Sequence, residues 1–277
     1  MKPFFSVVIP TLNEEKYLPK LLSNLAEQTF DGFEVMVVDG QSEDKTSLVV
    51  QKFMRRFPLW QFIQGGRKNV SYQRNLGAQK AQGKYFIFFD ADVNINPTCL
   101  EELHVACLKQ KFSLATTWME GDSSESVDQV VILLGNLGME LAKSVNNPFA
   151  GGYDIIVEKK TFFKLLGFRE DLKLSEDQDL IKRAQKKEIE LIILKEPKVT
   201  ISLRRFRSEG TLNVLRKYAQ IYIYGFLKGP ITQELFDYPM GGHVHMERRK
   251  KRFNMVMVNK YIRKMQQLEK KFNKLVS

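Results

Sequence analysis

The chain has 277 residues, of which 43% are hydrophobic and 27% are charged, a balance that excludes a disordered or fibrous protein and favours a soluble globular one. The formal net charge of +11 is unevenly distributed. Residues 203–277 hold 17 Lys and Arg against 5 Asp and Glu, whereas residues 1–202 hold 26 against 27. We therefore predict one domain over 1–202 and a basic, aromatic-rich helical appendage over 203–277.

Apolar runs alternate with amphipathic segments in the first 90 residues, which predicts βαβ units and a mainly parallel α/β sheet with flanking helices. The run 85–89 lies between Gly83 and Asp90 and is typical of a central strand buried on both faces. The predicted strands are 4–9, 33–38, 59–63, 85–89, 112–117, 153–157, 191–194 and 198–203. The main predicted helices begin near 18, 43, 71, 97 and 175, with three more over 126–144, 211–227 and 247–274.

Polar side chains follow three of these strands, at Thr11, at Asp39, and at Asp90 and Asp92. Because parallel strands end at the same edge of a sheet, we expect these residues to lie together. Residues two apart in an extended segment point to the same side, so Asp90 and Asp92 can face one small volume. Two such carboxylates suit Mg²⁺ or Mn²⁺ shared with a diphosphate, although an acidic cap for the next helix is the alternative.

Five short motifs, in their residues, order and spacing, resemble glycosyltransferase family 2. The resemblance covers roughly residues 4–202 and leaves the basic appendage outside. Its motifs are VVIPTLNEE (7–15), VVDGQSEDKT (37–46), RNLGA (74–78), DAD (90–92) and SEDQDL (175–180).

The resemblance implies a Rossmann-like GT-A fold that binds a nucleotide-diphosphate sugar. It implies that Pro10, Thr11 and Glu14 line the nucleotide pocket and that Asp39 accepts a hydrogen bond from the base. A carboxylate can hold an N–H donor of uracil or guanine. For Glu14, the alternative is a charge that complements a helix N-terminus.

The resemblance also implies a diphosphate site. Arg74 is expected near the diphosphate or the ribose, with a surface arginine as the alternative. Asp92, helped by Asp90, would hold the Mg²⁺ or Mn²⁺ that neutralises the leaving diphosphate. His243, two residues before His245 in a Gly-rich loop, is a candidate third ligand, and an ordinary loop histidine is the alternative.

The acidic cluster before the helix near 175 implies the general base of an inverting transfer. Asp177 is the first candidate, with Glu176 and Asp179 as competitors, because one of the three is expected to cap the helix. Gly151 and Gly152 would let the backbone approach the substrates, or form a plain turn.

The chain also departs from relatives. It lacks the Gln-x-x-Arg-Trp motif of processive members and has only RRFR at 204–207, so polymer extrusion is not expected. A hydroxyl acceptor, on a glycan or a lipid-linked molecule, is favoured over a lipid phosphate. The alternatives are an inactive nucleotide-sugar-binding relative, a nucleotidyltransferase, and a nucleic-acid-binding protein that acts through its basic appendage.

The appendage predicts an anionic partner. Segment 211–227 interleaves tyrosines with Arg216 and Lys217, which suits an interfacial helix on anionic lipid, and a solvated helix packed on the domain is the alternative. No nucleic-acid-binding motif accompanies the charge, so nucleic acid is not expected. Cys99 and Cys107 share one predicted helix at a spacing too long for a disulfide, which favours a reducing compartment. We expect a cytoplasmic protein, free or held peripherally at the inner face of the membrane.

Overall fold

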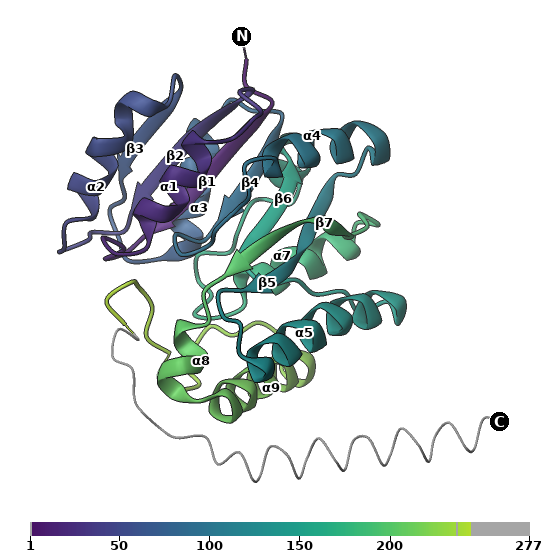
Figure 1. Cartoon of the computed structure of the whole chain (residues 1–277). Coiled ribbons are helices and arrows are strands. Elements are labelled where there is room, and N and C mark those ends of the chain that lie inside the picture. Colours follow the sequence, from purple (N-terminus) through teal and green to yellow (C-terminus); the bar gives the residue numbers. More distant parts are fainter. Residues whose placement is uncertain (1, 237, 245–277) are drawn as a thin grey trace. The chain divides into compact units, whose positions relative to one another are not determined.

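The computed structural model describes residues 2–236 and 238–244, in which seven strands form one sheet with the order β3-β2-β1-β4-β6-β5-β7 (Figure 1). The strands are β1 (Phe5–Thr11), β2 (Phe33–Asp39), β3 (Trp60–Gln64), β4 (Tyr85–Phe89), β5 (Leu114–Gly121), β6 (Asp154–Glu158) and β7 (Ile192–Ile201). The helices are α1 (Leu18–Ala26), α2 (Thr46–Phe53), α3 (Val70–Lys80), α4 (Cys99–Gln110), α5 (Ser126–Ser144), α6 (Lys159–Lys164), α7 (Glu176–Gln185), α8 (Arg204–Glu209) and α9 (Thr211–Leu227), and Met54–Arg56 forms a 3-10 turn.

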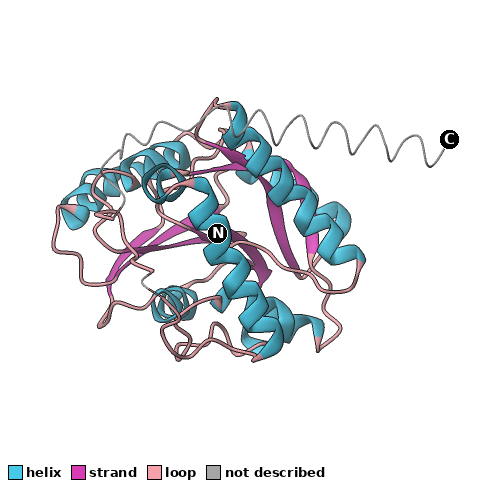
Figure 2. Ribbon diagram, turned by 90° about the horizontal axis from the view of Figure 1, so that it is seen from below, coloured by secondary structure: helices cyan, strands magenta, loops and turns pink. Residues whose placement is uncertain are grey.

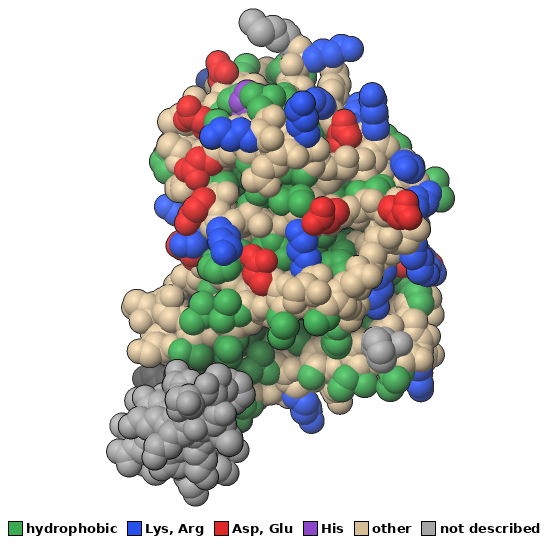
Figure 3. Space-filling model, turned by 90° about the vertical axis from the view of Figure 1, so that its right-hand side faces the viewer, with side chains coloured by type: hydrophobic (Ala, Val, Ile, Leu, Met, Phe, Trp, Pro, Cys, Tyr) green, Lys and Arg blue, Asp and Glu red, His purple; other side chains and the backbone are tan. Residues whose placement is uncertain are grey.

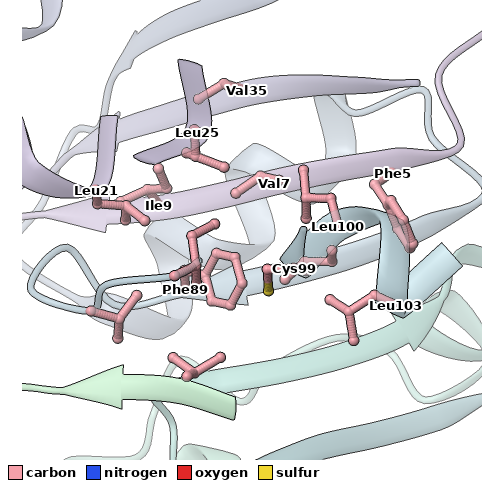
Figure 4. Close-up of a cluster of buried hydrophobic side chains, with 14 of the residues drawn as sticks. Phe5, Val7, Ile9, Leu21, Leu25, Val35, Phe89, Cys99, Leu100 and Leu103 are labelled. Carbon is pink, nitrogen blue, oxygen red and sulfur yellow. The ribbon is translucent and has the colours of Figure 1, made fainter. Parts of the chain in front are cut away.

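Helices cover both faces of the sheet and bury two separate cores, so the domain is a three-layer α/β/α structure (Figure 2). One core packs α1, α2 and α4 against one face of the sheet, and Figure 4 shows Leu21, Leu25 and Leu100 facing strand residues there. The other core packs α3, α6 and α7 against the opposite face. Both cores use alternate residues of the same strands, as expected when a strand is buried on both sides.

The predicted fold class is confirmed. Strands β1 to β4 pair in parallel, while β6 runs antiparallel to both β4 and β5. Strand 85–89 and helices 126–144 and 211–227 have the predicted limits. Both cysteines are free and buried.

Some parts of the chain differ from the prediction, and others lie outside its test. Segments 191–194 and 198–203, predicted as two strands, form the single strand β7, because a register shift against β5 absorbs the irregular middle. Helices α6 and α8 were not predicted, since six residues are too few to show helical periodicity. The predicted helix 247–274 lies outside the described residues. The boundary after residue 202 stays a prediction, while α8 and α9 belong to the same compact unit as the sheet.

Helix α3 lies unusually close to the sheet because of Gly77. A β-carbon at this position would stand 2.5 Å from a methyl carbon of Val8 and 3.0 Å from one of Val38. The close approach lets Gln73 of α3 donate hydrogen bonds to the carbonyl oxygens of Thr11 and Val38, each at 2.8 Å. Because Gly77 permits this close approach, Arg74, the residue after Gln73, lies beneath the carboxyl ends of the strands.

The core also contains an acid, Asp154, at the start of β6. Its side chain is fully buried, and neither carboxyl oxygen has a hydrogen-bond partner among the described residues. Burial raises the pKa of Asp154 to about 7, although the neighbouring Thr117 favours the charged carboxylate and so lowers this pKa. The pKa of Asp154 in the folded state lies above its ordinary value of 3.8. The protonated carboxyl group therefore stabilises the folded state. This stabilisation is fully present below pH 3.8 and is lost as the pH rises through about 7.

We predict that Asp154→Asn removes this pH dependence. Relative to the variant, the wild-type free energy of unfolding should fall by about 1–3 kcal/mol between pH 5 and pH 8. Urea denaturation at the two pH values measures the difference, with the exposed Asp31→Asn as the control. Equal pH slopes for the wild type and Asp154→Asn would contradict the prediction.

Candidate active site

The carboxyl ends of β1 and β2 bring together the predicted nucleotide-binding residues. Thr11 donates a hydrogen bond to Asp39 over 3.1 Å, and Ser42 donates to both oxygens of Asp39 through its hydroxyl at 2.5 Å and its backbone N–H at 2.9 Å. Pro10 is buried within β1 opposite Val38. These bonds fix the orientation of the Asp39 carboxylate at the sheet edge.

Glu14 follows on the loop after β1 and faces an arginine that the sequence did not single out. Arg204, the first residue of α8, lies 3.3 Å from Glu14 and 3.1 Å from Asp92, and stacks over the ring of Tyr17 at 4.3 Å. Burial raises the pKa of Glu14 to about 7, and Asp92 adds to this, whereas Arg204 lowers it. Arg204 therefore joins the first and third polar strand ends through one guanidinium group.

A second arginine, Arg74 of α3, lies at the centre of the other half of the site. Its guanidinium group donates to Glu176, Asp90 and the carbonyl oxygen of Gly152, each at 2.8 Å. The residue is only 1% exposed. Burial disfavours its charge, but Asp90 and Glu176 outweigh this effect, so the pKa of Arg74 is raised. The structure thus places Arg74 beneath the acidic residues, as a buried bridge between α3, β4, β6 and α7.

Asp177 differs from the two neighbouring acids of α7. Glu176 pairs with Arg74, and Asp179 pairs with Arg183 at 2.7 Å. Asp177 accepts a backbone hydrogen bond from Gln178 on Oδ1 and makes no ion pair with any described residue. Burial, and then the charge of Glu176, raise its pKa to about 7.

Gly152 supplies the space beside the Asp177 carboxylate. A β-carbon at Gly152 would lie 3.2 Å from Oδ2 of Asp177 and 3.2 Å from a guanidinium nitrogen of Arg74. Any larger residue would crowd both groups. The predicted close approach of the backbone at 151–152 is therefore made to the protein's own charged side chains.

The candidate metal ligands are only partly brought together. Burial raises the pKa of Asp90 to about 6 and raises that of Asp92, so both carboxylates lie where a cation would stabilise them. His243 instead lies beside Asn13, at 3.1 Å between their side-chain nitrogens. Within residues 2–236 and 238–244, no three His, Cys, Asp or Glu side chains converge on a metal position. His245 lies outside the described residues.

A donor set of one or two carboxylates is nevertheless what Mg²⁺ ordinarily takes from a protein, because substrate phosphates and waters complete its shell. Asp92, whose ion pair is with the less deeply buried Arg204, fits this role better than Asp90, which is held by the buried Arg74.

Two site residues escaped the sequence analysis. Arg204 stands in a basic run that carries no position-specific signal, although its place directly after the last strand could have suggested the sheet edge. Gln73 precedes the recognised RNLGA motif and bonds only to backbone oxygens, a role that no spacing reveals.

The family model described as glycosyl transferase family 2 matches residues 6–128, a stretch that includes Thr11, Asp39, Arg74 and Asp92. The chain is 32% identical over 128 residues to poly(ribitol-phosphate) beta-N-acetylglucosaminyltransferase TarS of Staphylococcus aureus, covering 45% of this chain and 22% of that protein. It is 29% identical over 168 residues to a dolichyl N-acetyl-alpha-D-glucosaminyl phosphate 3-beta-D-2,3-diacetamido-2,3-dideoxy-beta-D-glucuronosyltransferase of Methanococcus voltae, covering 58% of this chain and 50% of that one. The chain thus spans half or less of these two relatives.

Solved structures show the same fold. TarS residues 1–349 in complex with UDP-GlcNAc superpose with a TM-score of 0.60 at 25% identity, over 73% of this chain and 58% of that one. The mannosyltransferase PcManGT of Pyrobaculum calidifontis, solved with GDP-Man and Mn²⁺, gives a TM-score of 0.62 at 17% identity, over 80% of this chain and 65% of that one. The GT-A architecture expected from the sequence is confirmed.

Arg74→Met should destabilise the protein strongly. The change leaves Asp90 and Glu176 without their buried counter-charge, so we expect the free energy of unfolding to fall by about 3–5 kcal/mol. The matched control is Arg67→Met, which removes a guanidinium group that is 60% exposed and 3.4 Å from Glu170, and should cost less than about 1 kcal/mol. Urea denaturation of both variants tests the difference, and equal losses would show that the Arg74 cluster is not a stability determinant.

Proposed function

The chain belongs to glycosyltransferase family 2, and from this premise we propose that it transfers a sugar from a nucleotide-diphosphate donor to a hydroxyl acceptor with inversion of configuration. The observation that carries the proposal is the state of Asp177. In a cluster where Arg74 takes Glu176 and Asp90, this carboxylate makes no ion pair among the described residues and has its pKa raised to about 7.

A general base works best when its pKa lies near the working pH, because it is then both deprotonated and basic enough to take a proton. Asp177 meets this condition. In the proposed step its Oδ2 takes the proton of the acceptor hydroxyl as that oxygen attacks the anomeric carbon, opposite the leaving diphosphate. Glu176 supports the step indirectly, since its negative charge raises the pKa of Asp177.

The donor nucleotide is proposed to bind at the ends of β1 and β2. In this proposal Asp39, which Thr11 and Ser42 orient, would accept a hydrogen bond from the base, with Pro10 and Glu14 as further lining. Uridine diphosphate is the first nucleotide to test, because the solved relative at 25% identity is a complex with UDP-GlcNAc.

The charges at the site support an anionic donor with a cation. Among the described residues, the five carboxylates of Glu14, Asp90, Asp92, Glu176 and Asp177 lie around the guanidinium groups of Arg74 and Arg204, and the charge of Arg205 also acts on Asp92. A bound Mg²⁺ or Mn²⁺, held by Asp92 with Asp90, would neutralise the charge that develops on the departing diphosphate. Arg204, whose side chain bridges Glu14 and Asp92, supplies a positive charge of the protein itself beside Asp92.

The acceptor is proposed to be a hydroxyl group of a glycan or of a lipid-linked molecule. The two curated relatives act on different acceptors by their names, a poly(ribitol-phosphate) and a dolichyl-linked sugar. Both names include a sugar or polyol unit, which carries hydroxyl groups of the kind that Asp177 would deprotonate.

We predict metal-dependent nucleotide binding. Calorimetric titration with UDP, GDP, dTDP and CDP should show one nucleotide that binds in Mn²⁺ and much more weakly in EDTA. Asp92→Ala should reduce the Mn²⁺ contribution by at least about 10-fold because it removes the proposed ligand. Unchanged affinity in Mn²⁺ would refute the assignment of Asp92, and no binding of any nucleotide would indicate an inactive relative.

Asp177→Asn should leave donor binding intact and lower the transfer rate by about 100-fold or more, as expected for loss of a general base. In the wild type, kcat should rise with pH through about 7, because the base must be deprotonated, and this rise should vanish in the variant. The control is Asp179→Asn, whose carboxylate pairs with Arg183. Near-normal turnover of Asp177→Asn would move the role to Glu176.

A further inference from the structure

Helix α5 exposes a row of large apolar side chains. Six of them are between 48% and 66% exposed, whereas amphipathic helices normally bury such residues. At 100° per residue the six fall within an arc of about 120°, and they extend over about 22 Å of helix. They are Val130, Leu133, Leu134, Leu137, Leu141 and Val145.

The orientation of α5 is fixed by polar residues on its inner face. Asn136 is 4% exposed and forms two hydrogen bonds of 3.0 Å with the backbone N–H and carbonyl of Met119 in β5. Glu140, the one acid between Gln129 and Ala142, accepts a hydrogen bond from Trp118 at 3.1 Å. The helix is thus held with its leucines outward.

Helix α9 adds a second exposed apolar row with basic neighbours. Leu212, Ile223 and Leu227 are all more than half exposed. The sequence from 210 to 233 contains no acidic residue and three basic ones, of which Arg216 and Lys228 are exposed. Apolar side chains combined with cations and no acids match the chemistry of an anionic lipid surface.

The two rows lie in the same region of the molecule. Phe149, just beyond α5, lies against Gly138 of that helix and has its ring centre 6.3 Å from that of Tyr222 in α9. Asn147 donates a hydrogen bond to the Tyr222 hydroxyl. Figure 1 places both helices at the lower end of the domain. Figure 3 views the right-hand side of Figure 1 and shows hydrophobic side chains gathered at its lower end, with most charged side chains above them.

Beside α9 lies a groove of about 340 Å³. It is lined mainly by apolar groups, with Lys228 as its one charged residue, and its other lining residues include Ile223, Leu227, Leu235 and Phe236. A groove of this composition offers an acyl chain apolar contact and a phosphate group a cation.

We propose that the outer faces of α5 and α9 form a docking surface for an anionic membrane. Exposed apolar areas of several hundred Å² are rare on soluble monomers and mark contact with a partner or a membrane. The exposed Arg216 of α9 and Lys228 just after it favour anionic lipid by charge complementarity. None of the helices within the described residues has the length and hydropathy of a membrane-crossing segment.

The docking surface is connected to the proposed base. The segment that follows α5 runs through Phe149 to Gly152, whose carbonyl oxygen binds Arg74 and whose Cα adjoins Asp177. This segment links the docking surface to the backbone beside the proposed base.

Vesicle flotation of the full chain tests the proposal. The wild type should float with phosphatidylcholine vesicles that contain phosphatidylglycerol and much less with phosphatidylcholine alone. Leu134→Glu/Leu141→Glu should lower the partition coefficient by at least about 30-fold, because both side chains would enter the lipid. The matched control is Leu108→Glu/Leu166→Glu, which changes leucines that are 55% and 87% exposed on other elements and should float like the wild type.

The melting temperature and nucleotide affinity of both variants should equal those of the wild type, because all four side chains are exposed. Flotation of Leu134→Glu/Leu141→Glu at the wild-type level would overturn the proposal and assign any membrane binding to another part of the chain. A wild type that does not float but forms a dimer, which the same variant disrupts, would also overturn it and make the face a self-association surface. Flotation requires no turnover, so loss of the transferase proposal would leave this result unaffected.

Discussion

The buried guanidinium group of Arg74 is the interaction on which the rest of the site depends. It joins α3, the end of β4, the start of β6 and the first turn of α7 through three hydrogen bonds of equal length. Those four segments come from positions up to 102 residues apart in the chain. A charge can stay in such a place only if its partners are also charged, and the cost of separating them holds these four segments together.

The two arginines differ in their burial and in the acids with which they pair. Arg74 is enclosed and pairs with acids whose positions it fixes, whereas Arg204 is the more exposed of the two and bridges acids that face the proposed donor. The acids outnumber the arginines, and burial raises the pKa values of Glu14, Asp90 and Asp177 to between about 6 and 7. These carboxylates therefore titrate between about pH 6 and 7, where binding of a cation or a proton would change their charge state.

Much of the fold could be predicted because it depends on local patterns. The buried run 85–89 and the alternation of strands and helices define the sheet, and the parallel pairing of β1, β2 and β4 then brings Thr11, Asp39 and Asp90 to one edge. The antiparallel entry of β6 and the outward face of α5 could not be predicted in this way. The direction of β6 is set by its pairing with β4 and β5, and the orientation of α5 by contacts such as that of Asn136 with Met119, and neither is visible in a local pattern.

The sequence predicted which residues form the site better than it predicted what each residue does there. The motif residues do lie together, but the sequence shows that Arg74 is charged without showing that it is buried. In the same way, His243 shares the region of the first motif through Asn13 and not the position of Asp92. Burial and pairing are properties of the assembled core, so a spacing argument identifies which side chains meet at the sheet edge and leaves their division of work open.

The hydrogen bond between Arg74 and Gly152 has a consequence for mutational tolerance. Its acceptor is a backbone carbonyl oxygen, a group that every amino acid carries, so no substitution at 152 deletes it chemically. A side chain there acts in a different way, because its β-carbon would lie 3.2 Å from charged groups of both Arg74 and Asp177 and would require them to shift. Variation at residue 152 therefore acts on this contact through volume, whereas variation at Arg74 acts on it through charge.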